Sequence, residues 1–153
     1  MGEPVMTPYY MAQLEEARKY QDFVKHELYK RGIPIVFNDS THYQYDEGEN
    51  ILGIEIKNDK MFRDTGNLYI EVEEKADANN KNYVKSGILR NDNSWLYLIG
   101  DYLTVYIFAV NLLVGLYETK KYKNVEKPTS RGFLLPLGDA NKYAARVIEI
   151  KKA

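Results

Sequence analysis

The sequence predicts an α/β fold in which helices pack against a mixed central sheet. Three observations support this: a helical apolar pattern near the start, alternating or continuous apolar strands in the middle, and a second helical pattern at the end. The chain has 153 residues, of which 44% are hydrophobic and 28% charged, so it is long enough to enclose a core. We therefore expect residues 1–153 to form a single domain.

The first half of the chain is predicted to contain one long helix and three strands. Residues 7–31 show helical apolar spacing, and Gly32 is expected to end the helix. The apolar segment 33–38 is expected to form a short strand. Apolar and polar residues alternate in 51–59 and 67–74, as they do in strands buried on one face. Because these two strands follow each other closely, we expect an antiparallel hairpin.

The second half is predicted to contain two apolar strands, two helices and a short extended segment. The two strands are expected at 94–102 and 103–110, and the two helices at 110–118 and 138–152. Between the helices we expect a loop at 119–131, followed by the extended segment at 132–137. Trp95 is expected to be buried at the start of the first of these strands.

Composition excludes several classes of protein. No apolar run reaches the roughly 18 residues that span a bilayer, and the first ten residues do not resemble a signal peptide. The chain has no cysteine and two histidines, which excludes disulfides and thiolate zinc sites and argues against a histidine-built metal site. We therefore expect a cytoplasmic protein without a membrane partner, in which any metal ion has oxygen ligands.

The strand predicted at 67–74 presents a row of acidic residues on its polar face. Glu71 and Glu73 lie about 6.6 Å apart along that face, and Lys75 continues the row. In the predicted hairpin, Glu55 would lie opposite the neighbourhood of Glu71. Crowded carboxylates must raise their pKa values, spread into water or share a cation, and Mg²⁺ is the cation best suited to oxygen ligands.

This arrangement resembles the PD-(D/E)xK nucleases, the restriction-endonuclease-like superfamily. That family places an acid on one core strand and a (D/E)-x-K motif on the adjacent strand, after an amino-terminal helix. Glu55 and Glu71 match the two acidic positions, sixteen residues apart, and "GNLYIEVEEK" resembles the motif strand. The chain departs from the pattern because its first acid is glutamate and Glu73 follows where lysine is usual. The segment Glu73-Glu74-Lys75 restores a literal E-x-K, and Lys57 is a second candidate for the lysine.

The resemblance implies a restriction-endonuclease-like core and a Mg²⁺- or Mn²⁺-dependent DNA endonuclease. Glu55, Glu71 and the backbone carbonyl of Val72 would bind the metal ion, and Glu73 or Lys75 would position the attacking water. The implied catalytic residues are therefore Glu55, Glu71, Glu73 and Lys75. A stand-alone domain of this size would suit a phage or mobile element, and a homodimer would cut both DNA strands.

Further charged residues extend this interpretation. A basic stretch interrupted by Tyr122 suits phosphate contact with DNA, although a solvated loop has the same composition. Its members are Lys120, Lys121, Lys123, Lys127 and Arg131. Asp59 and Asp64 flank the loop of the predicted hairpin as candidate outer metal ligands, and Glu27 of the first helix is a candidate additional acid.

Two other interpretations remain open at the level of sequence. The chain could be a non-catalytic DNA- or protein-binding module on the same fold, which the departure from (D/E)-x-K favours. It could also be a structural subunit whose acidic strand simply faces water. Metal binding would distinguish the nuclease from both alternatives. DNA binding without cleavage would distinguish the binding module from the structural subunit.

Overall fold

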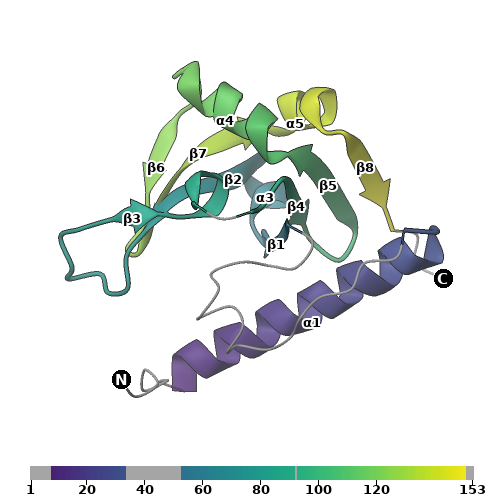
Figure 1. The fold of residues 1–153 in the computed structure, drawn as a ribbon, viewed down its shortest axis with the longest axis horizontal. Helices are drawn as coiled ribbons and strands as arrows, with labels where there is room; N and C mark the ends of the chain where they lie inside the picture. The colour runs from purple at the N-terminus through teal and green to yellow at the C-terminus, as the bar shows by residue number, and fades with distance from the viewer. Residues whose placement is uncertain (1–7, 34–52, 92, 151–153) are drawn as a thin grey trace.

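The computed structural model describes residues 8–33, 53–91 and 93–150, which form two four-stranded sheets flanked by helices (Figure 1). The first sheet has the order β1-β4-β5-β8, and the second has the order β3-β2-β7-β6. Strand β1 runs parallel to β4, whereas every other pairing is antiparallel. The predicted α/β class with a mixed sheet is therefore confirmed, but two sheets share the strands that were expected in one central sheet.

The elements have the following bounds. The strands of the first sheet are β1 Ile54–Asn58, β4 Leu96–Gly100, β5 Thr104–Ala109 and β8 Arg146–Glu149. Those of the second sheet are β2 Asn67–Glu74, β3 Val84–Lys85, β6 Asn124–Glu126 and β7 Ser130–Pro136. The helices are α1 Pro8–Lys30, α3 Phe62–Thr65, α4 Val110–Glu118, α5 Leu137–Tyr143 and the short 3₁₀ helix η1 Gly87–Leu89.

Helix α1 covers one face of the first sheet and lies along the lower side of Figure 1. Tyr20, Val24 and Leu28 recur at helical spacing, are each 1% exposed, and pack on apolar residues of all four strands of that sheet. Gly32 follows the helix with a φ of +78°, so the predicted end is confirmed. The strand predicted at 33–38 falls outside the described residues from position 34 onward. Among the described helices, none combines the length and apolar character that a bilayer crossing requires.

The larger core lies between the two sheets and is closed by α4 and α5. Leu68, Ile70 and Val72, which the sequence places on one face of β2, are at most 3% exposed there. They belong to the same cluster as large aromatic side chains of β4, β5 and β7, namely Tyr97, Tyr106, Phe108 and Phe133. Trp95 precedes β4 rather than lying within it and is 61% exposed, so its predicted burial is wrong.

The predicted hairpin between segments 51–59 and 67–74 is also wrong. Strand β1 pairs with β4, whereas β2 pairs with β7 and, at its end, with β3. Between β1 and β2, helix α3 and Gly66, whose φ is +76°, turn the chain from the first sheet into the second. Asp59 connects the two sheets at this junction, because its carboxylate accepts the backbone N–H of Tyr69 in β2 at 2.9 Å.

Two predicted boundaries near the end of the chain need correction. The helix expected over 138–152 ends at Tyr143, and Val147 and Ile148 lie in β8, where they pair with β5. These β-branched residues complete the first sheet instead of forming a helical stripe. The loop expected over 119–131 contains β6 and the first residues of β7, which pair as a short antiparallel ribbon.

Neighbouring leucines on β7 provide a matched test of the core between the sheets. Leu135 is fully buried, whereas Leu134 is only partly buried on the opposite face of the strand. We expect Leu135→Ala to lower the free energy of unfolding by about 2–5 kcal/mol and Leu134→Ala by less than about 1 kcal/mol. Urea denaturation followed by circular dichroism measures both values. Equal losses would contradict the assignment of the two faces.

Candidate functional site

Two charged residues of the sequence-predicted site project from the edge strand β1. Glu55 and Lys57 are two residues apart, so they share one face of the strand, and their neighbours on β4 are Tyr97 and Ile99. The Lys57 Nζ lies 3.3 Å from Glu55 Oε1. The Glu55 side chain is 15% exposed and that of Lys57 is 40% exposed.

The negative charge of Glu71, on the second sheet, acts on the same ammonium. Burial disfavours the charged form of Lys57, but the carboxylates of Glu55, Glu71 and Glu74 outweigh that effect and raise its pKa above the ordinary value of a lysine. Lys57 therefore remains protonated at neutral pH. Glu55 is ion-paired with Lys57, and Glu71 acts on the same cation from beyond ion-pair distance, although the strands that carry the two carboxylates belong to different sheets and do not pair.

Tyr97 forms the buried side of this cluster and is 1% exposed. Its pKa lies well above the ordinary value for tyrosine, first because of burial and then because of the negative charges of Glu55, Glu71 and Asp59. A hydrogen bond with the backbone of Glu71 acts in the opposite direction. The Tyr97 ring thus extends from the first sheet to the backbone of β2, and its hydroxyl stays neutral at physiological pH.

The segment that starts η1 holds Glu71 from its other side. Ser86 is fully buried, and its Oγ donates a hydrogen bond to Glu71 Oε2 at 2.9 Å while its N–H donates to the carbonyl of Val72 at 2.9 Å. Gly87 has a φ of +53°, and a Cβ at this position would lie 2.0 Å from the Glu71 carbonyl oxygen. Sequence analysis missed Ser86, because nothing local in "KSGIL" indicates which strand the segment will meet.

Glu73 and Lys75 are separated from this cluster by an irregularity in β2. The register between β2 and β7 shifts between Glu71 and Glu73, as at a β-bulge. Glu73 Oε2 then lies 3.9 Å from Arg131 Nη1, and Lys75 Nζ lies 4.7 Å from the centre of the Tyr83 ring. Lys57 is therefore the lysine that pairs with Glu55, whereas Lys75 lies at Tyr83.

The other predicted acids have local roles. Asp59 accepts the N–H groups of Met61 and Phe62 as well as that of Tyr69, whereas Asp64 is exposed on α3. Glu27 is ion-paired on α1, where hydrogen bonding from Arg31 lowers its pKa. Within the described ranges, no three acidic or histidine side chains gather closely enough to form a metal-binding group by themselves.

The basic stretch divides into two groups. Lys120, Lys121 and Lys123 follow α4 and are exposed, and Lys121 Nζ lies 5.0 Å from the centre of the Tyr122 ring. Lys127 and Arg131 lie at the turn between β6 and β7 and at the start of β7, on the sheet that contains Glu71.

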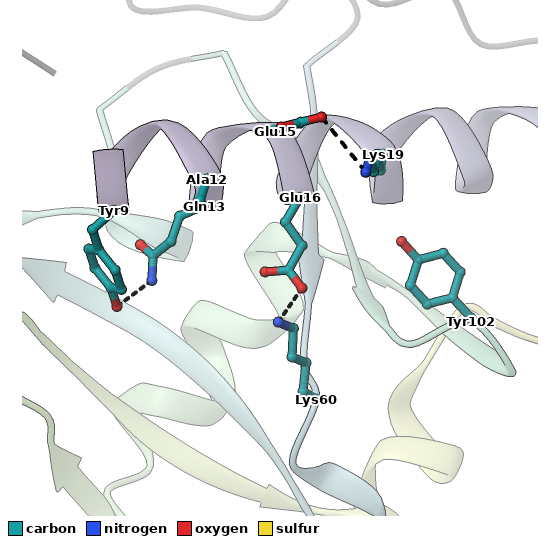
Figure 2. Close-up of a pocket in the computed structure, with 8 residues that line it drawn as sticks. All are labelled: Tyr9, Ala12, Gln13, Glu15, Glu16, Lys19, Lys60 and Tyr102. Atoms are coloured by element: carbon teal, nitrogen blue, oxygen red, sulfur yellow. Dashed lines mark hydrogen bonds and ion pairs between the residues drawn. The ribbon is translucent and has the colours of Figure 1, made fainter. Parts of the chain in front are cut away.

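A separate hollow lies beside the amino-terminal half of α1 (Figure 2). Figure 2 shows Glu16 ion-paired with Lys60 across it, with Tyr102 at one end and Tyr9 hydrogen-bonded to Gln13 at the other. None of the sequence-predicted site residues lines this hollow. The cluster around Glu71 therefore remains the candidate site.

Comparison of the chain with sequence profiles of protein families, with curated proteins and with solved structures finds no match.

The contact between Gly87 and Glu71 can be tested with a pair of glycines. We expect Gly87→Ala to lower the free energy of unfolding by roughly 2–4 kcal/mol, because the new Cβ meets backbone and the φ is positive. Gly115→Ala is the control, because Gly115 lies within α4 with open space around it. That substitution should stabilise the protein by about 0.5–1 kcal/mol or leave it unchanged. Chemical denaturation of both variants gives the comparison, and a harmless Gly87→Ala would refute the close approach.

Proposed function

We propose that this chain is a Mg²⁺-dependent DNA endonuclease that uses Glu55, Glu71 and Lys57. The observation that supports this most strongly is the ion pair of Lys57 with Glu55, which lies within the negative field of Glu71, a carboxylate of the other sheet. Charged side chains without a catalytic or binding role are mostly exposed to water, whereas clustered, partly buried charges are more frequent at functional sites. The residue types agree with the resemblance of the sequence to the PD-(D/E)xK nucleases.

The donors fit a hard divalent cation. Mg²⁺ in phosphate-processing sites is commonly bound by one or two carboxylates, with water and substrate oxygens completing the shell. Glu55 and Glu71 would be the carboxylate ligands of Mg²⁺ or Mn²⁺. The carbonyl of Val72, which accepts a hydrogen bond from the Ser86 N–H, would be the third oxygen ligand. A bound ion would supply Lewis acidity, which polarises a phosphoryl oxygen and lowers the pKa of a coordinated water.

The side chains of the protein have distinct parts in this proposal. Lys57, held protonated by its carboxylate neighbours, would stabilise negative charge that develops on the phosphate. Ser86 would act as a positioning residue, because the hydrogen bond from its hydroxyl to Glu71 Oε2 fixes the orientation of that carboxylate. Glu73 and Lys75, which follow the bulge, would act on the substrate beyond the cleaved bond.

A non-catalytic binding module is the second candidate function. Lys57 already compensates part of the negative charge of Glu55, which reduces the need for a metal ion. The lack of a three-acid group within the described residues also favours this alternative. In that case the cluster would be an internal ion network, and DNA would bind without being cut.

Cleavage of supercoiled plasmid distinguishes the two candidates. We expect the native chain to nick plasmid in Mg²⁺ or Mn²⁺ and to lose this activity in EDTA. Glu71→Gln and Lys57→Gln should each lower the rate at least about a hundredfold, because both groups would stabilise charge in the transition state. Ser86→Ala should cost about ten- to a hundredfold, as expected for a group that orients a ligand.

The control is Glu118→Gln, which removes an exposed carboxylate at the end of α4 and should leave the rate unchanged. Identical purification of all variants excludes a contaminating nuclease. If Lys75→Gln abolishes cleavage while Lys57→Gln does not, the lysine role belongs to Lys75. If no protein cuts in either metal, or all cut equally, the endonuclease proposal is rejected.

A further inference from the structure

The second sheet has one face whose apolar side chains join neither hydrophobic core. Helices α4 and α5 lie on the other side of this sheet, where Ile70 of β2 and Phe133 of β7 belong to the larger core (Figure 1). Side chains that alternate with these residues along the strands point the opposite way. Among the described residues, Leu134 of β7 and Val125 of β6 belong to neither core cluster and are only partly buried. We call this side the outer face of the second sheet.

The strand register arranges the outer face in three rows that cross β6, β7 and β2. Glu71 of the candidate site lies in the middle row, and a lysine stands at the β6 end of each row beside it. The Cα atoms of β6 and β2 lie about 10 Å apart along a row, because only β7 separates the two strands. From β6 to β2, the rows are Lys123, Leu134 and Tyr69; Val125, Gly132 and Glu71; and Lys127, Ser130 and Glu74.

The Tyr69 ring lies across β7 on the outer face. A Cβ at Gly132 would lie 2.8 Å from Tyr69 Cε2, so the glycine leaves the space that the ring occupies. The Tyr69 hydroxyl lies 2.8 Å from Ser130 Oγ, and Lys127 Nζ lies 3.9 Å from the centre of the ring. These contacts fix the orientation of the ring in advance of any ligand. The centre of the outer face is therefore an aromatic surface that rests on the backbone of β7.

Positive charge on the outer face is concentrated on the β6 side. Lys123 and Lys127 are exposed, and within the described ranges neither forms an ion pair. A tyrosine ring attracts a cation without neutralising it, so the contact with Tyr69 leaves the charge of Lys127 in place. The carboxylates of this face, Glu71 and Glu74, lie on β2. A polyanion can thus meet the two lysines without breaking an ion pair.

This arrangement favours single-stranded DNA over a duplex. A duplex keeps its bases stacked inside and presents phosphates, which need only cations. An unpaired strand also exposes its bases, which stack on aromatic side chains beside a positively charged groove. The outer face offers cations on the β6 side and a ring with apolar neighbours across β7, so it suits both parts of a nucleotide. A surface for duplex phosphates alone would not need the aromatic and apolar centre.

We propose that the outer face of the second sheet binds single-stranded DNA that crosses from β6 over β7 toward Glu71. This inference rests on the proposed function for its account of why DNA is bound, and it deepens that function by naming the form of the substrate. Lys123 and Lys127 would contact phosphates. A base would stack on Tyr69 as the Lys127 ammonium moves from the ring to a phosphate. The strand would then continue to the middle row, where Glu71 lies.

Binding measured in EDTA tests this surface without any cleavage. Fluorescence anisotropy is recorded with three labelled probes: a 20-nucleotide thymidine strand, its duplex with the complementary strand, and a strand of the same length that lacks its bases. We expect the native chain to bind the thymidine strand at least about tenfold more tightly than either other probe, because only that probe offers unpaired bases. Equal affinity for the three probes would overturn the inference.

Variants of Tyr69 test whether a base stacks on the ring. Tyr69→Leu should lower the affinity for the thymidine strand about five- to a hundredfold and leave the affinity for the abasic strand unchanged. Tyr69→Phe keeps the ring and should bind like the native chain, which separates stacking from the contact with Ser130. The matched control is Tyr83→Leu, because Tyr83 lies against Arg131 on the opposite face of the same sheet. Circular dichroism verifies that each variant is folded, and an equal loss in Tyr83→Leu would contradict the choice of face.

Lysine variants test the phosphate contacts. For Lys123→Gln/Lys127→Gln, the slope of log affinity against log salt with the thymidine strand should decrease by about 1.4, since each phosphate contact on a single strand contributes about 0.7. The charge-matched control is Lys85→Gln/Lys142→Gln, because Lys85 stands opposite Glu73 on the other face and Lys142 belongs to α5. An unchanged slope in the first variant, or equal changes in both, would overturn the inference.

The same probes separate this inference from the proposed nuclease. A chain that binds the thymidine strand selectively in EDTA but cuts no DNA in Mg²⁺ would reject the nuclease and support this surface. A chain that cuts DNA in Mg²⁺ but binds the three probes equally would support the nuclease and reject this surface.

Discussion

The carboxylate of Asp59 holds together the point where the chain leaves one sheet and enters the other. One oxygen accepts the N–H groups of Met61 and Phe62, and the second accepts that of Tyr69. The Asp59 N–H donates to the carbonyl of Gly100, which keeps the end of β1 against β4. Backbone donors at a strand edge need a partner, and Asp59 gives one to the N–H of Tyr69 where β2 separates from β1.

That separation determines the chemistry of the site. With β2 in a second sheet, the buried Tyr97 can fill the space between the sheets and reach the backbone of Glu71. The Ser86–Gly87 segment occupies the other side of the same carboxylate, where a hairpin partner strand would otherwise lie. Glu71 is thus held by Tyr97 and by the Ser86–Gly87 segment. Neither belongs to the hairpin of segments 51–59 and 67–74 that the sequence predicts.

Charge balance links the site to its surroundings. Lys57 is ion-paired with Glu55, and the negative charges of Glu55, Glu71 and Glu74 raise its pKa. At the end of the second sheet, Lys127 lies against Tyr69 on one face, and Lys75 and Arg131 lie against Tyr83 on the other.

The sequence by itself determined the local elements, because periodicity is a property of neighbouring residues. It located α1, β1, β2, the β4–β5–α4 succession and the buried face of β2, and it singled out Glu55 and Glu71. Only the tertiary structure decided which strands pair, since hydrogen-bond partners distant in the chain satisfy the same pattern equally well. For the same reason, only the fold could associate Lys57, Tyr97 and Ser86 with Glu71 and place Lys75 over Tyr83 instead.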